Sequence, residues 1–183
     1  MDPRRAIRAA LRLCMNEKEN IIEGRPWSES VYKLYSEEIE ALKKLAEEVK
    51  EDKERAKEVL KILVEELIDY PIRCSLIVDS GLWENVKDAD PRLAKVALFL
   101  MRRELSEEAV EELMKSHKGR ALLAGRIEER VKNAVLRRLD GSNFVYDELD
   151  ELRYLLNVAE SLSGYIDKRI LSRWKKVVEC ISK

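Results

Sequence analysis

The sequence predicts an all-α protein, a multi-helix bundle of about eight or nine helices with short loops, and three observations support this fold class. Apolar residues recur at intervals of three and four positions along most of the 183 residues. Residue types that start helices (Asp, Ser, Pro) and stop them (Gly) lie between these stretches. No β-hairpin signal and no repeat period occurs in the sequence.

The first part of the chain contains three long helical patterns. The first is expected to begin at Asp2, which can cap it, and to end by Gly24. The second covers residues 26–49. The third covers residues 52–70, because Pro71 disfavours helical backbone at the residue before it. A short charged connection joins the second and third helices, which predicts an antiparallel pair.

A short apolar segment, residues 71–80, follows these helices. It fits a buried helix or a strand, and Pro at its first position with Gly directly after it favours the helix. The connector that follows is the longest in the chain. We therefore expect residues 1–183 to form one helical domain, with a subdivision near residues 80–90 into an N-terminal part (1–80) and a C-terminal part (90–183).

Five further helices are expected in the second half of the chain. Asp90 precedes Pro91 at the start of one helix, and Ser106 can cap the next. Gly119 and Gly164 are expected to end helices. The expected helices cover residues 91–101, 106–119, 120–140, 149–164 and 166–181.

Charged residues make up 39% of the chain, and the two signs nearly cancel at a net charge of −1. This balance argues against a uniformly basic nucleic-acid coat and against an acidic disordered chain. The chain has no Gln and no Thr but is rich in Glu, Lys and Arg. This composition suits high temperature, because the desolvation of charges costs less there, and predicts a hyperthermophile protein. A general helix bias is the alternative, since the same residues favour helices.

The three cysteines are Cys14, Cys74 and Cys180, which are far apart in the sequence. None forms the C-x-x-C spacing of a zinc or redox site. Each lies in an apolar helical stripe, so we expect each to be a small buried side chain. The sequence has no membrane-length apolar run and no signal-peptide pattern, which predicts a cytoplasmic protein without membrane contact.

No motif for catalysis, a metal or a cofactor is recognisable, so the sequence predicts a non-enzymatic protein that needs no cofactor. The one histidine, His117, lacks the Glu three positions earlier that a di-metal site in a helical bundle uses. We expect it to be solvated or to lie at the C-terminal end of a helix, where a positive charge is favourable. The glycines mark helix ends, apart from Gly125, and form no phosphate-binding loop.

Charge is segregated along the chain. Residues 36–70 contain twelve Asp or Glu against seven Lys or Arg. The first helix contributes the basic residues Arg4, Arg5, Arg8 and Arg12. The candidate basic face consists of Lys118, Arg120, Arg126, Arg130, Lys132, Arg137, Arg138, Lys168, Arg169, Arg173, Lys175 and Lys176. Such a face can bind phosphates with release of counterions. Alternatively, these residues pair with acidic helices of the same protein or of a homo-oligomer.

Two tryptophans, Trp27 and Trp83, lie in expected connectors, where a large aromatic side chain can anchor a protein interface. The alternative is that each closes one end of the helical core. No aromatic residues that could stack on bases are interleaved with the basic residues, which weakens a direct nucleic-acid role.

Residues 26–32 combine aromatic and acidic side chains before a long helix, and a second long helix through residues 63–67 leads into the basic and apolar segment 72–77. In these features residues 26–78 resemble the helical A-domain of archaeal GINS replication subunits. The resemblance implies a non-catalytic scaffold in a replicative helicase assembly. Two features depart from the family: Pro71 interrupts the second helix, and residues 142–183 are expected to be helical where a small β-rich domain would follow.

The sequence therefore favours a non-catalytic helical interaction or scaffold subunit of a larger intracellular assembly, associated with nucleic-acid processing or replication. Other protein subunits are the expected partners, and a homo-oligomer is compatible with the sequence. One alternative is a protein that binds nucleic acid directly through the basic helices 118–138 and 168–176. Another is a helical enzyme or toxin whose site has no signature in the sequence.

Overall fold

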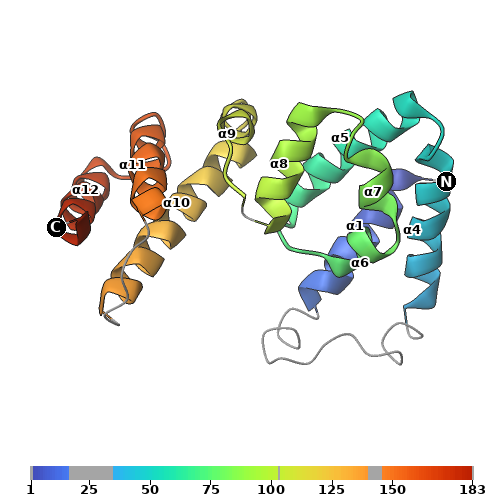
Figure 1. Cartoon of the computed structure of the whole chain (residues 1–183), viewed down its shortest axis with the longest axis horizontal. Helices are drawn as coiled ribbons and strands as arrows, with labels where there is room; N and C mark the ends of the chain where they lie inside the picture. Colours follow the sequence, from blue (N-terminus) through green and yellow to red (C-terminus); the bar gives the residue numbers. More distant parts are fainter. Residues whose placement is uncertain (1, 17–34, 103, 140–145, 183) are drawn as a thin grey trace. The chain divides into compact units, whose positions relative to one another are not determined.

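The computed structural model describes residues 2–16, 35–102, 104–139 and 146–182. These residues form ten helices and no strand (Figure 1), which confirms the all-α prediction. No helix among them is long and apolar enough to cross a membrane. Trp27, with the rest of residues 17–34 and the start of the GINS-like segment, lies outside the described residues.

The contacts between residues divide the chain into two compact units, unit 1 up to Glu112 and unit 2 from Leu113. The subdivision expected near residues 80–90 falls inside unit 1. The reason is that this connector contains a short helix, α7 (Leu82–Val86), which packs against three other helices of the same unit.

Three long helices of unit 1 lie within the ranges that the sequence predicts, although the second begins at Ser36, in an expected range whose residues 26–34 lie outside the described part of the chain. They are α1 (Pro3–Asn16), α4 (Ser36–Val49) and α5 (Lys53–Asp69). The Asp52 side chain caps α5 by accepting a hydrogen bond of 3.0 Å from the backbone N–H of Arg55. Helix α5 ends at Asp69, two residues before Pro71, as the restriction on residues before proline requires.

The segment whose structure the sequence left open contains a five-residue helix, α6 (Ser75–Asp79), and no strand. The helix begins four residues later than Pro71, and the backbone of Cys74 at its N-cap is extended. Gly81 then adopts a φ of +84°, which turns the chain into α7. The left-handed backbone of Gly81 therefore lets two short helices pack in a small space.

The core of unit 1 lies between α1, α4 and α5, with α6 and α7 covering it and α8 (Pro91–Arg102) packed on α5. Fully buried leucines and isoleucines from these helices fill the core, among them Ile7, Leu42 and Leu63. Trp83 is only 6% exposed and belongs to this core. Its side chain is therefore not available to anchor a protein interface. Its position agrees with the alternative, in which the tryptophan closes one end of the helical core.

The end of unit 1 is formed by α8 and α9 (Glu107–Leu113), whose starts match the predicted caps. The Asp90 carboxylate accepts a hydrogen bond of 3.1 Å from the backbone N–H of Arg92, and the Ser106 hydroxyl accepts one of 3.2 Å from that of Ala109. The Arg92 guanidinium then pairs with two carboxylates of α9, Glu111 and Glu112. These ion pairs connect the outer sides of the two helices.

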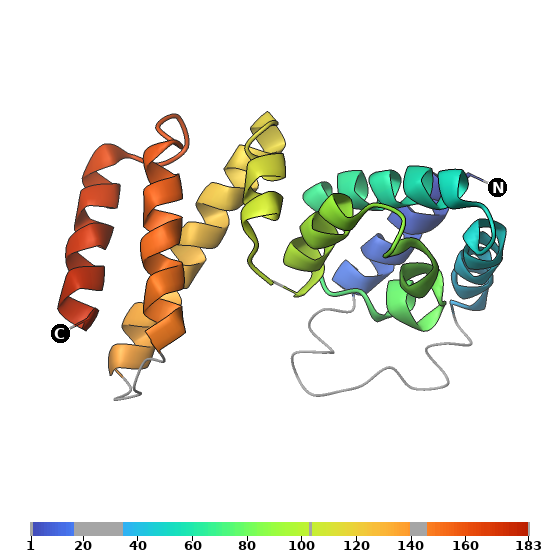
Figure 2. The ribbon, with the colours of Figure 1, turned by 45° about the horizontal axis from the view of Figure 1, so that its top comes forward.

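Unit 2 contains three long helices, α10 (His117–Leu139), α11 (Tyr146–Glu160) and α12 (Lys168–Ser182). Each packs against the other two, and successive helices run in alternating directions (Figure 2). Two buried residues from each helix form the centre of the core, namely Val131, Ala134, Leu152, Leu156, Val178 and Ile181. Unit 2 is thus an up-and-down three-helix bundle.

The prediction that Gly119 ends a helix is wrong, because this glycine lies in the first turn of α10. The Ser116 hydroxyl caps α10 by accepting a hydrogen bond of 2.9 Å from the Gly119 backbone N–H. A Cβ atom at Gly119 would lie 2.1 Å from the carbonyl oxygen of Leu113. Glycine is required here because the turn before α10 approaches its backbone closely.

Cys14 and Cys74 are buried, as predicted, whereas Cys180 is exposed and departs from the prediction. Cys14 of α1 and Cys74 before α6 form a disulfide, with their Cα atoms 5.5 Å apart, although 60 positions separate them in the sequence. Packing of α1 beside α6 brings them together. Cys180 is exposed on α12, because it lies on the side of that helix opposite its buried residues.

Candidate basic interface

Three of the four arginines of α1 have side-chain partners within unit 1, whereas Arg5 is exposed and has none among the described residues. Arg4 and Arg8, one helical turn apart on α1, both hydrogen-bond to Glu66 of α5, at 2.9 and 2.8 Å. The Glu66 side chain is 1% exposed, whereas both arginines are more than 40% exposed. Arg4 also pairs with Glu65. These arginines therefore pair with an acidic helix of the same protein, which is the alternative to a basic face that binds phosphates.

Glu66 is the buried charge at the centre of this contact. The hydrogen bond from Arg8, together with that from Arg4, holds the pKa of Glu66 below its ordinary value, although burial opposes this. Further along α1, Arg12 donates a hydrogen bond of 3.3 Å to the Tyr70 hydroxyl. The basic side of α1 is therefore a contact with α5 and contributes to the packing of unit 1.

Most basic residues of α10 have partners inside unit 2. Arg126 and Lys132 pair with Glu129 and Glu128 of the same helix, at 3.6 and 2.9 Å. The two pairs to α11 are Arg130 with Glu151 and Arg137 with Glu148. Lys118 and Arg138 are exposed at the two ends of α10. The ion pairs neutralise part of the positive charge of α10. This helix can therefore bind an external anion less well than its number of basic residues indicates.

Arg120 forms hydrogen bonds within a cluster that also contains His117. The Tyr165 hydroxyl accepts a hydrogen bond of 3.2 Å from Arg120 Nε and lies 2.6 Å from His117 Nδ1. A second bond of 2.8 Å joins Arg120 to the carbonyl oxygen of Met114. His117 is exposed, as expected, but it is the first residue of α10, so the expectation of a C-terminal helix position is wrong. The cap at Ser116 starts a new helix directly before it.

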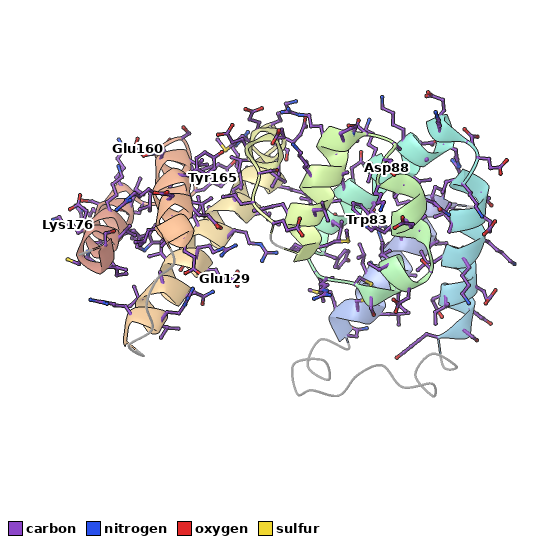
Figure 3. The ribbon with its side chains drawn as sticks, viewed as in Figure 1. Trp83, Asp88, Glu129, Glu160, Tyr165 and Lys176 are labelled. Atoms are coloured by element: carbon purple, nitrogen blue, oxygen red, sulfur yellow. A yellow bond between two sulfur atoms is a disulfide. The ribbon has the colours of Figure 1, made fainter. Side chains whose placement is uncertain are left out.

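Helix α12 differs from α1 and α10. Val178 and Ile181 are buried on its inner side. Arg169, Arg173 and Lys176 are exposed and follow one another at spacings of four and three residues, which places them on one side of the helix, opposite Val178. We call these three residues the α12 basic stripe. Lys168 is exposed beside it, and Figure 3 marks Lys176 on α12.

The α12 basic stripe has no ion-pair partner among the residues that the structure describes. The one lysine of α12 with a carboxylate partner there is Lys175, which lies outside the stripe and pairs with Glu160 of α11. Of the predicted basic face, the structure thus brings Lys168 and the stripe together as charges directed to solvent. It places Arg120, Arg126, Arg130, Lys132, Arg137 and Lys175 in contacts within unit 2.

The stripe is suited to binding a row of phosphates. Its three residues span about 10 Å along the helix axis, at 1.5 Å per residue. Phosphates of one strand advance by about 3.4 Å each along the axis of a duplex, so a stripe parallel to that axis would extend over about three nucleotide steps. Two of the three residues are arginines, whose guanidinium groups can bind a phosphate through two hydrogen bonds.

Two features of the structure have no signal in the sequence. The buried carboxylate of Glu66 belongs to the sequence Val64-Glu65-Glu66-Leu67, which gives two adjacent glutamates and no indication of which one faces α1. The Tyr165 cluster joins residues more than forty positions apart. Small residues of α10 at helical spacing, Ala121, Ala124 and Gly125, are a visible pattern whose role depends on α12.

Comparisons with models of protein families, with curated proteins and with solved structures found no significant match to this chain. Among the described residues, no group of three or more His, Cys, Asp or Glu side chains is arranged to hold a metal ion.

Proposed function

We propose that this protein is a helical interaction subunit of an assembly that handles nucleic acid, and that the α12 basic stripe is its contact with the phosphate backbone. The observation that carries the proposal is the contrast among basic helices. Three of the four basic residues of α1 and most of those of α10 have acidic or hydroxyl partners, whereas all three residues of the stripe face solvent on the side of α12 opposite its buried residues. Contacts with phosphate are independent of base sequence, so we expect binding without sequence preference.

The proposal is tested with a pair of variants that remove equal charge. Arg169→Gln/Arg173→Gln/Lys176→Gln removes the stripe, and Arg126→Gln/Arg130→Gln/Lys132→Gln removes three α10 cations that have carboxylate partners. The readout is the fluorescence anisotropy of a labelled DNA duplex of mixed sequence. We expect the stripe variant to lose affinity on the order of tenfold and the α10 variant to lose much less. Equal losses, or no binding by the unmodified protein, would contradict the proposal.

The partner proteins of such an assembly are open to direct test. The tagged protein is purified from its source organism before and after nuclease treatment. Defined proteins that remain after nuclease support a scaffold role, and replicative helicase components among them support the resemblance to GINS subunits. Loss of all bound material after nuclease leaves nucleic acid as the ligand and argues against the scaffold role.

We also infer that the protein works in the cytoplasm. The disulfide between Cys14 and Cys74 is compatible with this compartment in hyperthermophiles, whose intracellular proteins are often rich in disulfides. The charged, amide-poor composition supports the same interpretation. Alkylation of thiols in freshly lysed source cells tests whether the disulfide is present there: one reactive thiol per chain shows that it is, whereas three show that it is absent.

A further inference from the structure

An exposed serine, Ser172, lies in the second turn of α12, next to the α12 basic stripe. On the surface of a helix, the neighbours of a residue are those three and four positions away. For this serine all four neighbours are basic, namely Lys168, Arg169, Lys175 and Lys176. No other serine of the chain has basic residues at all four of these positions. A hydroxyl group therefore lies in the middle of a ring of cations.

The Ser172 hydroxyl forms no hydrogen bond with the residues that the structure describes. Other serines of unit 2 use their hydroxyl groups in the fold. Ser116 caps α10, and the Ser182 hydroxyl donates a hydrogen bond of 2.7 Å to the carbonyl oxygen of Val178. A group added to the Oγ atom of Ser172 would thus break no described hydrogen bond and would lie in solvent beside the stripe.

Three of the four cations around Ser172 are available to an added anion. Lys168, Arg169 and Lys176 have no ion-pair partner in the described part of the chain. The fourth, Lys175, pairs with a carboxylate of α11. Cβ atoms three or four positions apart on a helix lie about 5–6 Å from each other, which Lys and Arg side chains can span. A phosphate on the serine would therefore pair with Arg169 and Lys176, two of the three residues of the stripe.

We infer that Ser172 is a phosphorylation site, and that its phosphate closes the α12 basic stripe to nucleic acid; this inference rests on the proposed function. A protein kinase would transfer the γ-phosphoryl group of a nucleoside triphosphate to the Oγ atom. The Oγ–P bond forms, the bond from this phosphorus to the bridging oxygen of the departing nucleoside diphosphate breaks, and the hydroxyl proton is released. The basic surroundings of the serine favour a kinase with an acidic substrate site.

The phosphate would act on the stripe in two ways. Its charge of about −2 lowers the charge of the three-residue stripe from +3 to about +1. Because it is attached to α12, it also competes with the phosphates of nucleic acid at a high effective concentration. The cations that bind a nucleic-acid phosphate are thus the ones that the phosphoserine occupies.

The test compares the unmodified protein with two forms in which phosphoserine is incorporated during translation, at position 172 or at position 163. Ser163 is an exposed serine before α12, and none of its neighbours at three and four positions is basic. In the anisotropy assay with the DNA duplex, phosphoserine at position 172 should weaken binding at least about tenfold and make the salt dependence shallower. Phosphoserine at position 163 should change the affinity less than about twofold. Thermal unfolding shows that each form is folded.

Use of the site in the cell is tested by mass spectrometry of the protein from its source organism, purified with phosphatase inhibitors during growth and starvation. We expect phosphate on Ser172 in a fraction of the chains, and recovery of duplex binding by that fraction after phosphatase treatment. Absence of this phosphate under both conditions would overturn the inference, as would equal duplex binding with and without phosphoserine at position 172. Either result leaves the proposed function intact. If the unmodified protein does not bind the duplex, the proposed function fails, and the inference fails with it.

Discussion

Helices α1 and α12 carry similar rows of basic residues, but the two rows have different surroundings. On α1, Arg4, Arg8 and Arg12 follow one another at four-residue spacing and contact α5. On α12, the basic stripe has nearly the same spacing but faces solvent. The comparison teaches that the spacing of charges on a helix does not indicate their partner. The neighbouring helix decides, because α5 offers the buried carboxylate of Glu66 and no described helix offers one to the stripe.

The two helices also differ in how firmly they are attached. Helix α1 is connected to the rest of unit 1 by the Cys14–Cys74 disulfide as well as by Glu66. Helix α12 is held mainly by its apolar residues, with Cys180 free on its surface. We therefore expect substitutions at the polar contacts of α1 to change stability and substitutions in the stripe of α12 to change binding.

The largest expected effect on stability is loss of the disulfide. Because it closes a loop of 60 positions, the chain-entropy model gives a contribution of about 4 kcal/mol to the free energy of unfolding. Cys14→Ala/Cys74→Ala should therefore lower the urea midpoint strongly, whereas Cys180→Ala should not change it. If the two variants unfold at the same urea concentration, the disulfide does not hold α1 in place.

Substitution of the buried carboxylate is expected to have the next largest effect. Glu66→Gln replaces hydrogen bonds between charged groups and should lower the free energy of unfolding by about 2 kcal/mol. Glu65→Gln is the matched control, since Glu65 is 42% exposed, and its effect should be much smaller. Equal effects of the two substitutions in urea unfolding would mean that burial of Glu66 contributes nothing.

The pH dependence of stability gives an independent test of the same residue. Since the pKa of Glu66 is lower in the folded protein than in the unfolded chain, its contribution is complete above the unfolded value of about 4.3. The contribution is lost as the pH falls through the lower, folded pKa. The stability difference between the unmodified protein and Glu66→Gln should therefore shrink below about pH 4. A difference that stays constant down to pH 3 would contradict this.

Two glycines of α10 are expected to respond in opposite directions, Gly119→Ala by about 1–3 kcal/mol and Gly125→Ala by up to about 1 kcal/mol. Gly119→Ala should destabilise unit 2, because its Cβ atom would collide with the Leu113 carbonyl. Gly125→Ala should stabilise it, because alanine favours the helix and nothing lies within 4 Å of the new atom. Thermal unfolding of both variants measures the effects. Stabilisation by Gly119→Ala would show that the turn before α10 is not closely packed.

The smallest expected effect on stability belongs to the α12 basic stripe itself. Arg169→Gln/Arg173→Gln/Lys176→Gln should leave the melting temperature unchanged, since these side chains have no described ion-pair partner. A clear drop in the melting temperature would show that the stripe stabilises the protein, as the arginines of α1 do.

Local signals allowed much of the fold to be predicted from the sequence. Asp52, Asp90 and Ser106 cap helices where expected, because a cap depends only on residues within one turn. Gly119 misled the prediction, since glycine also fits a close approach at the start of a helix. The basic residues were identified, but which of them have partners depends on contacts between distant helices, as with Arg4 and Glu66. The disulfide was not predicted for the same reason.

The salt dependence of duplex binding tests most directly the claim that the α12 basic stripe is a contact surface. Three phosphate contacts predict a slope of about −2.7 in a plot of log affinity against log salt concentration, or about a 40-fold loss between 50 and 200 mM salt. The variant Arg169→Gln/Arg173→Gln/Lys176→Gln should have a much shallower slope. A steep slope that is the same in the unmodified protein and in this variant would contradict the claim, because the phosphates would then contact other residues.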